Sequence, residues 1–259
     1  MTAELFTERI GVTLVLTLSD PGTRNSLSHQ VIAAGIESLN TAKADPEIRC
    51  VLLRGDGDHF CAGGNLQGLL ARRREGPPAQ VEMLEHLNQL IDALQVFPKP
   101  VIAAVEGAAA GAGFSLALAC DLIVAAEDAR FMLSHGRLGL SPDGGATSAL
   151  AQALPRALVQ QLVWLGETVT AQQLHGWGVV SAVADRGHAV AKALRLADRL
   201  AAMAPNAIAS GKQLVRQAAG RSLNAQLDAE RDHFIENLFH DNGAEGLNAF
   251  LEKRSPQFK

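Results

Sequence analysis

The chain has 259 residues, a length that corresponds to one or two domains of ordinary size. Hydrophobic residues make up 47% and charged residues 19%, which excludes a disordered or fibrous chain. The net charge of −4 gives no basic excess for nucleic acid or an anionic membrane surface, so we predict neither partner. The N-terminus MTAELFTERI lacks the form of a signal peptide, and the uncharged, Gly-rich stretch 107–120 is too short to span a bilayer. We therefore expect a soluble cytoplasmic protein.

The cysteines and most histidines give no sign of a metal centre. Cys50, Cys61 and Cys120 show no metal-ligand spacing, and their odd number argues against a disulfide framework. The histidines without ligand spacing along the sequence are His29, His59, His86, His175, His188, His233 and His240. The sequence therefore predicts no metal site.

Short apolar runs alternate with helical patterns in the first half of the chain. Residues 12–18 and 48–53 are typical of strands, and Ser28 is placed to cap a helix that runs to about residue 44. Residues 81–97 are helical in pattern, and a buried strand follows at 101–105. Before this helix lies the segment ARRREGPPAQ, within residues 68–80, which we expect to be a mobile loop because of its arginines and prolines.

The same alternation continues beyond residue 105. Residues 114–119 form an apolar helical run, and residues 122–126 and 179–183 have the pattern of strands. Strands that alternate with helices predict an α/β architecture with parallel pairing.

The last part of the chain is almost entirely helical in pattern. The amphipathic segments are 189–203, 206–219, 222–239 and 243–253. We place a boundary near residue 200, with an α/β core at 1–199 and a helical region at 200–259. The apolar face of this region is suited to pack either on its own core or on a neighbouring subunit.

Two strand–turn–helix units carry the most informative sequence. In CVLLRGDGDHFCAGGNL and VIAAVEGAAAGAGFSLALACDL, a strand ends in a turn of Gly and Ala. Small residues let a ligand approach the backbone, and a helix that begins there directs its free N–H groups at that ligand. Two such turns that converge would form an oxyanion hole; the alternative is tight packing of small residues. Neither turn has the spacing of a phosphate-binding or dinucleotide-binding loop.

Four segments in order resemble the crotonase, or enoyl-CoA hydratase/isomerase, superfamily. They are FCAGGNL, PVIAAVEGAAAGAGFSLALACDLIVAAEDARF, LGLSPDGGAT and EGLNAFLEKRSPQF, and the resemblance covers residues 12–258. The resemblance implies a ββα spiral core followed by a C-terminal helical trimerisation region. It also implies a homotrimer or a dimer of trimers, and a coenzyme A thioester as substrate with no cofactor beyond that CoA moiety.

The resemblance also assigns roles to individual residues. The thioester carbonyl would lie between the N–H groups of Ala62 and Ala112, which would stabilise an enolate. The family commonly has Gly at the second position. The residues that would bind the substrate or its CoA moiety are Arg24, Ser26, Gly63, Gly64, Asn65, Leu66, Gly111 and Lys253.

The acid and base groups distinguish members of the family. Typical hydratases carry two glutamates, where this chain has Ser115 and His135. Asp143 falls instead where isomerase-type members have their single acidic residue, although Pro-Asp-Gly also suits an ordinary type I turn. One carboxylate suffices to move a double bond, because it removes a proton and returns it two carbons away.

We therefore expect isomerisation of an enoyl-CoA, or of a ring-type unsaturated CoA thioester, with Asp143 as proton shuttle. One alternative is hydration with His135 and Asp143 in place of the glutamates. A second is hydrolysis with Ser115, His135 and Asp143 as nucleophile, base and orienting group. A third is a CoA-binding scaffold without catalysis.

Overall fold

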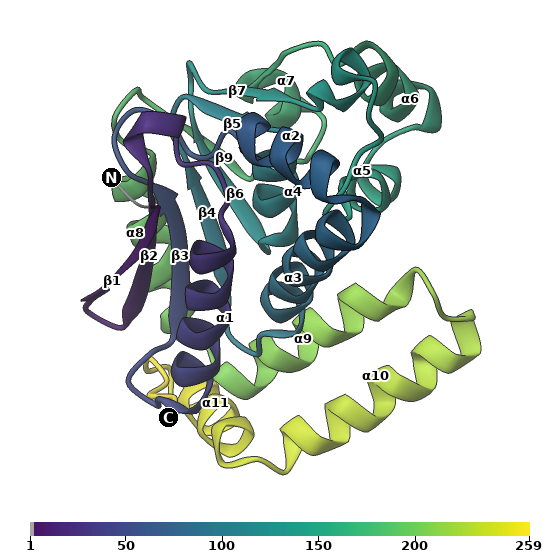
Figure 1. Ribbon diagram of the computed structural model, residues 1–259. Helices are drawn as coiled ribbons and strands as arrows, with labels where there is room; N and C mark the ends of the chain where they lie inside the picture. The colour runs from purple at the N-terminus through teal and green to yellow at the C-terminus, as the bar shows by residue number, and fades with distance from the viewer. Residues whose placement is uncertain (1–2) are drawn as a thin grey trace.

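Apolar runs form the strands of a twisted sheet in the computed structural model, which describes residues 3–259 (Figure 1). The strands are β1 Glu4–Ile10, β2 Thr13–Ser19, β3 Cys50–Gly55, β4 Val101–Val105, β5 Ala108–Ala110, β6 Leu122–Ala126, β7 Arg130–Met132, β8 Val169–Thr170 and β9 Ala182–Ala184.

The larger sheet has the strand order β1-β2-β3-β4-β6-β9, in which only the edge pair β1–β2 is antiparallel. In its centre, Leu52 of β3 lies opposite Val15 of β2 and Ile102 of β4. A smaller sheet has the order β5-β7-β8. The expected α/β architecture with parallel pairing is thus confirmed.

Helices cover both faces of the larger sheet. The helices are α1 His29–Ala44, α2 Leu66–Glu75, α3 Pro77–Val96, α4 Ala112–Ala119, α5 Ala146–Ala153, α6 Arg156–Leu165, α7 Ala171–Gly176, α8 Ala189–Ala201, α9 Pro205–Ala218, α10 Leu223–Leu238 and α11 Asp241–Leu251. Short 3₁₀ turns lie at Pro21–Thr23 and Ser134–Leu138.

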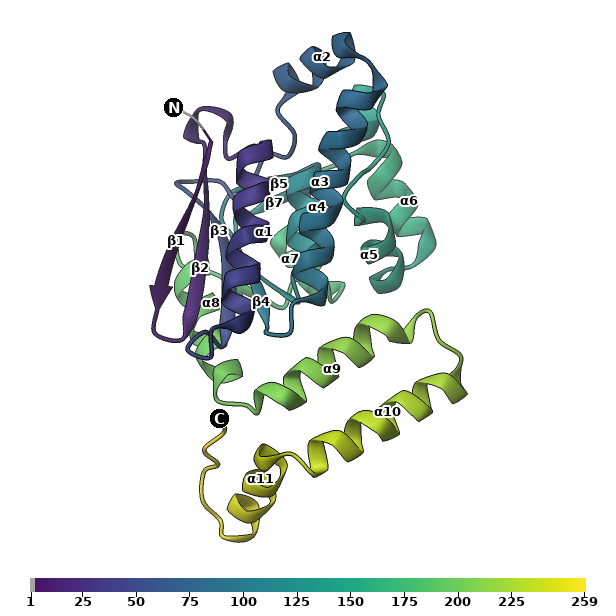
Figure 2. The ribbon, with the colours of Figure 1, turned by 60° about the horizontal axis from the view of Figure 1, so that its bottom comes forward.

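Each face of the sheet has its own apolar cluster. On one face, α8 buries Ala189, Ala193 and Ala197, which share one side of the helix because they are four residues apart. On the other face, α1, α3 and α4 pack over the sheet (Figures 1 and 2). The small alanine side chains let α8 approach the strands closely.

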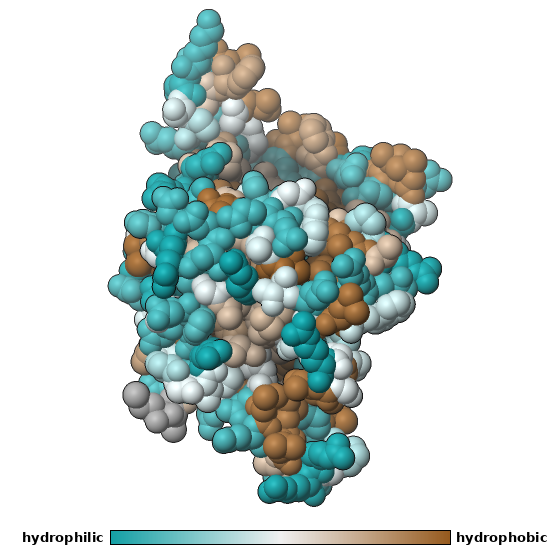
Figure 3. Space-filling view, turned by 90° about the horizontal axis from the view of Figure 1, so that it is seen from above, coloured by the Kyte–Doolittle hydropathy of each residue, from teal (hydrophilic) through white to brown (hydrophobic). Residues whose placement is uncertain are grey.

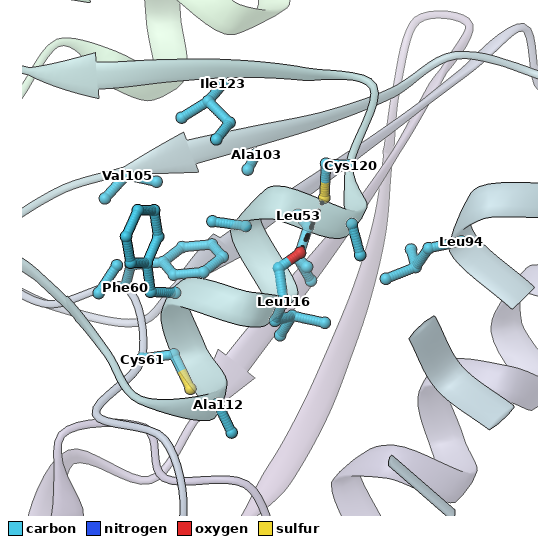
Figure 4. Close-up of a cluster of buried hydrophobic side chains, with 14 of the residues drawn as sticks. Leu53, Phe60, Cys61, Leu94, Ala103, Val105, Ala112, Leu116, Cys120 and Ile123 are labelled. Atoms are coloured by element: carbon cyan, nitrogen blue, oxygen red, sulfur yellow. Dashed lines mark hydrogen bonds between the residues drawn. The ribbon is translucent and has the colours of Figure 1, made fainter. Parts of the chain in front are cut away.

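The core around α4 is built from aliphatic side chains and a few phenylalanines (Figure 4). Phe60 and Leu116 are fully buried there, and the Sγ of Cys120 donates to the carbonyl of Leu116 at 3.5 Å. The ring of Phe114 contacts that of Phe131, with 5.1 Å between their centroids. Tight packing of this core fixes the start of α4 and the loop that precedes α2.

The expectation of a mobile loop in residues 68–80 is wrong. The side chain of Asn65 caps α2 by accepting from the N–H of Gly68 at 3.0 Å, and the three arginines occupy the last turn of this helix. Arginine is a good helix former, and cations are favourable near a helix C-terminus. Pro77 stands at the first position of α3, where its fixed φ favours helix initiation.

Four strands are absent from the sequence expectations: β1, β5, β7 and β8. β1 lies at the edge of the larger sheet and is mostly exposed, so it has no apolar alternation. β7 and β8 contain three and two residues. The strand expected at 179–183 is present as β9, which begins three residues later.

The four helical segments expected after residue 188 are present as α8 to α11. Helices α9, α10 and α11 form a layer that projects from the core (Figure 2). The boundary placed near residue 200 falls in the last turn of α8, and its role as a domain boundary stays a prediction. None of the helices within residues 3–259 combines the length and hydropathy that a membrane span requires.

Candidate active site

One cavity of about 930 Å³ collects most of the site residues expected from the sequence. Of these, the residues that line it are Arg24, Ser26, Ala62, Gly64, Asn65, Leu66, Gly111, Ala112, His135 and Asp143. Gly63 and Lys253 do not line it. The fold therefore brings together residues from the loop before α1, the loop before α2, the start of α4 and the segment before α5.

Asn25 holds the loop before α1 in place. Its amide Nδ2 donates to the carbonyls of Asp56 and His59, each at 2.8 Å. Arg24 and Asn25 both adopt left-handed backbone angles, with φ of 57° and 59°. These contacts bring the carbonyl of Arg24 to the loop before α2.

The assignment of Ala62 as an oxyanion donor conflicts with the structure. The N–H of Ala62 donates to the carbonyl of Arg24 at 3.0 Å, so this N–H is already paired. A paired backbone N–H has no second proton to offer a ligand. Sequence inspection missed the pairing because the acceptor lies 38 residues earlier in the chain.

Two other N–H groups on this wall of the cavity are unpaired. Among the described residues, neither the N–H of Gly64 nor that of Ala112 has a hydrogen-bond acceptor. Ala112 is the first residue of α4, where the N–H groups of a helix have no partner within the helix.

Gly63 keeps the two turns close to each other. A Cβ on Gly63 would lie 2.5 Å from the carbonyl oxygen of Ala110 and 3.0 Å from the nitrogen of Ala112. Its φ of 86° is also unfavourable for other residues. Gly63 thus acts on the geometry of the two turns and does not face the cavity.

Asp143 and His135 lie next to each other at the wall of the cavity. The Nε2 of His135 lies 3.4 Å from the Oδ1 of Asp143, and the side chains are 10% and 28% exposed. Within the described part of the chain, Asp143 Oδ1 and His135 Nδ1 are buried without a hydrogen-bond partner. A partly exposed carboxylate that lines a cavity can accept a proton from a bound ligand.

Ser115 is not arranged as a nucleophile. Its side chain is buried and does not line the cavity, and its hydroxyl donates to the main-chain carbonyls of Asp143 at 2.9 Å and Gly111 at 3.3 Å. Ser115 therefore fastens the Asp143 segment to α4. The Ser115–His135–Asp143 constellation considered for hydrolysis is not formed, because no contact joins the hydroxyl to His135.

Burial also removes Cys61 from the candidate nucleophiles. It lies in the loop before α2, and burial raises the pKa of its thiol to about 12. At neutral pH the thiol is protonated and unreactive.

The walls of the cavity divide into a cationic part and an apolar part. Arg24, Arg72 and Arg137 line it and are its only arginines or lysines among the described residues, whereas α3 contributes Met83, Leu84 and Leu87. Sequence reasoning missed Arg72 and Arg137. The run of arginines is the signal that could have found Arg72, but its composition predicts a loop. In the structure the Nε of Arg72 donates to Gln80 at 2.8 Å and links α2 to α3.

Lys253 follows α11, in a left-handed conformation with φ of 56°. Its N–H donates to the carbonyl of Phe250 at 3.2 Å, and its side chain is exposed. A CoA-binding role for Lys253 therefore has no support within a single chain.

Comparison with known proteins covers nearly the whole chain. A sequence model of the family described as "Enoyl-CoA hydratase/isomerase" matches residues 8–259. A 2,3-dehydroadipyl-CoA hydratase of Escherichia coli is 37% identical over 99% of both chains. A 1,2-epoxyphenylacetyl-CoA isomerase of the same organism is 38% identical over 95% of this chain and 94% of the other.

A crystal structure described as an enoyl-CoA hydratase from Polaromonas sp. JS666 superimposes with a TM-score of 0.97. It is 55% identical, over 98% of this chain and 99% of the other. The fold, the four sequence segments and the full-length similarity agree, and the chain belongs to the enoyl-CoA hydratase/isomerase family of crotonase-fold enzymes.

Proposed function

We propose that the protein moves the double bond of an unsaturated acyl-CoA thioester, with Asp143 as the single proton shuttle. One observation carries this proposal: among the described residues, Asp143 is the only carboxylate that lines the cavity. Ser115 stands where the family's hydratases have one of their two glutamates, and it is already bonded to main-chain carbonyls. A single base supports proton transfer between two carbons more readily than it supports addition of water.

The carboxylate of Asp143 removes a proton from Cα of a 3-enoyl thioester, and the electron pair spreads onto the thioester oxygen as a dienolate. The same carboxyl group then delivers the proton to Cγ, and the double bond moves into conjugation with the carbonyl. No atom is gained or lost. The side chain of Asp143 lines the cavity and is 28% exposed, which supports this role.

The N–H groups of Gly64 and Ala112 are the donors that stabilise the dienolate oxygen in this proposal. They take the place of the Ala62–Ala112 pair, because Ala62 donates to Arg24. Preorganised N–H donors stabilise a developing oxyanion more than they stabilise the ground-state carbonyl, which lowers the barrier.

The cationic wall supports binding of the CoA phosphates by Arg24, Arg72 and Arg137. Guanidinium groups form paired, charge-assisted hydrogen bonds with phosphate oxygens. Met83, Leu84 and Leu87 would accommodate the apolar acyl group. The relative named 1,2-epoxyphenylacetyl-CoA isomerase supports the inclusion of an aromatic-derived thioester among the substrates tested.

To test this proposal, the protein is incubated with 2-enoyl, 3-enoyl and aromatic-derived CoA thioesters, and the products are identified by mass spectrometry and NMR. Isomerisation leaves the mass unchanged, and turnover in D₂O should place deuterium at Cα or Cγ. Asp143→Asn should lower turnover by at least about a hundredfold, while the affinity for the thioester stays within severalfold. The matched variant His135→Gln should retain most of the activity. Loss of activity in His135→Gln alone would overturn the assignment, and binding without turnover of any thioester would favour a scaffold.

Hydration is the second candidate, and the contact between His135 and Asp143 favours it. The two groups lie 3.4 Å apart at the cavity wall and together would hold and deprotonate a water molecule. In that case the product gains the mass of one water, and both Asp143→Asn and His135→Gln lose activity.

We also propose that the protein assembles as a homotrimer or a dimer of trimers through its C-terminal helices. Large apolar side chains of these helices are exposed in the single chain, among them Phe234, Phe239 and Phe250. The face shown in Figure 3 likewise carries separate hydrophobic patches on a largely hydrophilic surface. In such an assembly Lys253 would approach the cavity of a neighbouring subunit.

A further inference from the structure

Three potential metal ligands meet on the surface where α1 packs on α3. The ligand atoms of His29, Glu82 and His86 all lie within 4.8 Å of one another. His29 is 53 residues before Glu82 in the sequence, so no short ligand motif marks this cluster. It is separate from the active-site cavity, since none of the three residues lines that cavity.

Two features of the fold bring these side chains together. Glu82 and His86 lie four residues apart on α3, so they share one face of that helix. His29 is the first residue of α1, directly after the capping Ser28. The two helices approach closely at Gly35, where an added Cβ would lie 3.1 Å from a methyl group of Leu90.

The two imidazole rings of the cluster lie close together, and one of their nitrogen atoms lacks a hydrogen-bond partner among the described residues. The imidazole rings of His29 and His86 are 4.2 Å apart and nearly perpendicular, at 83°. His86 Nδ1 is buried and has no hydrogen-bond partner among the described residues. A buried polar atom without a partner costs free energy, and a bound ion is one way to remove that cost.

The surroundings also favour a cation. His29 and His86 line an open groove between α1 and α3, together with Glu37, and no arginine or lysine within residues 3–259 lines this groove. Two imidazoles and one carboxylate form a donor set that suits zinc, with a fourth position open to water. Zinc–nitrogen bonds of about 2.0–2.1 Å place neighbouring ligand atoms about 3.3 Å apart, so the ligand atoms, now within 4.8 Å of one another, need to approach by up to about 1.5 Å.

We propose that His29, Glu82 and His86 bind a zinc ion that fastens the start of α1 to α3. Both helices also form walls of the active-site cavity, through Ile32 on α1 and Leu84 and Leu87 on α3. A zinc ion at this position therefore holds the wall of the substrate cavity from its outer side. The proposal does not depend on which reaction the enzyme catalyses.

The test uses the full chain after treatment with a chelator that is then removed. Zinc is titrated against a chromophoric competitor, and the melting temperature is measured with and without zinc. We expect one zinc ion per chain and a higher melting temperature. His29→Ala and Glu82→Gln should each weaken zinc binding by at least about tenfold and abolish the thermal shift, because each removes a ligand.

The exposed histidine His188 supplies the matched control, and His188→Ala should bind zinc as the unaltered protein does. Because His29 is exposed, its replacement leaves the core intact, which circular dichroism of the metal-free variant checks. Cobalt provides a second measurement, since visible absorption bands report its ligands. No stoichiometric zinc binding, or unchanged binding in His29→Ala, would overturn the proposal.

Discussion

The sheet core and the C-terminal helices are stabilised by different interactions. Nearly every buried apolar side chain lies before residue 198, whereas α9 and α10 contain no buried residue. In α11, only Asn242 and Ala249 are buried. The core therefore gains its stability from its own apolar residues, whereas the helical layer keeps a large apolar surface in contact with water.

Polar contacts attach this layer to the core. The ammonium group of Lys212 on α9 donates to Asp121 at 2.8 Å and to the carbonyl of Leu94 at 3.0 Å. The guanidinium of Arg49 donates to the carbonyl of Met203 at 3.0 Å. Hydrogen bonds are directional but contribute little net stability, so these contacts fix where the layer lies rather than how firmly it folds. Within a single chain, the apolar surface of the helical layer is therefore left uncovered, which is what the proposed trimer would bury.

The largest effect should come from charging the apolar face of the layer. We expect the triple variant Phe234→Glu, Phe239→Glu and Phe250→Glu to abolish the proposed trimer, because each assembly would bury nine carboxylates against apolar surface. Phe239 and Phe250 are 82% and 83% exposed in the single chain, so the fold itself should tolerate the change. Light scattering coupled to size exclusion measures the mass. The control is Phe6→Glu on β1, which should leave the mass of the assembly unchanged. An unchanged mass for the triple variant would contradict burial of this apolar face in a trimer.

Within the core, the next largest effect should follow loss of one N–H from the proposed oxyanion hole. Ala112 is the first residue of α4, a position where proline is well tolerated in helices. Ala112→Pro should therefore lower kcat by about a hundredfold to a thousandfold without unfolding the chain. Ala112→Gly keeps the N–H and is the matched control. Equal kcat for both variants would exclude Ala112 as a donor.

Removal of the main polar anchor should have a smaller effect, on stability alone. Lys212→Met keeps much of the side chain but leaves Asp121 without its cation, which should cost about 2–3 kcal/mol of unfolding free energy at neutral pH. Urea denaturation at fixed protein concentration measures it. The double variant with Asp121→Asn should recover most of the loss, and Lys43→Met, at an exposed site, should show none.

The pH dependence of this loss has a defined sign. Burial raises the pKa of the Asp121 carboxyl, although Lys212 opposes the shift. The folded chain therefore holds this proton to higher pH than the unfolded chain, and the cost of the unpaired carboxylate vanishes as acid protonates it. A deficit in Lys212→Met that stays constant from neutral pH to below pH 4 would contradict this account.

The smallest effect should appear at the end of the chain. Arg254 holds Glu245 through two hydrogen bonds of 2.6 and 2.8 Å and lowers the pKa of that carboxyl to about 2. This contact contributes stability above the unfolded pKa near 4.5, and the contribution is lost as pH falls toward 2. The N–H of Gln257 donates to Glu245 at 2.7 Å, and its protection against amide exchange, relative to the intrinsic exchange rate at each pH, should fall in that range. Glu245→Gln should show low protection at all pH values.

The sequence predicted the central strands well, because their apolar runs are fully buried. It missed β1, because an exposed edge strand does not need an apolar pattern. It missed α2, because the run of arginines in this helix is also typical of a surface loop. At the site, motif order pointed to Asp143 and Ala112, and both line the cavity. Sequence order did not show that the N–H of Ala62 pairs with Arg24, because that pairing depends on how distant loops meet. It also did not show that His29, Glu82 and His86 lie together, because two helices supply these side chains.

The reactivity of the three buried cysteines reports local opening of the chain. Burial raises the pKa of the Cys50 and Cys61 thiols to about 12 each and that of Cys120 further still, so none reacts while its surroundings stay closed. Cys50 lies in β3, Cys61 beside the proposed oxyanion donors and Cys120 after α4. The rate at which each thiol is alkylated therefore times the opening of a different part of the molecule, without any engineered probe.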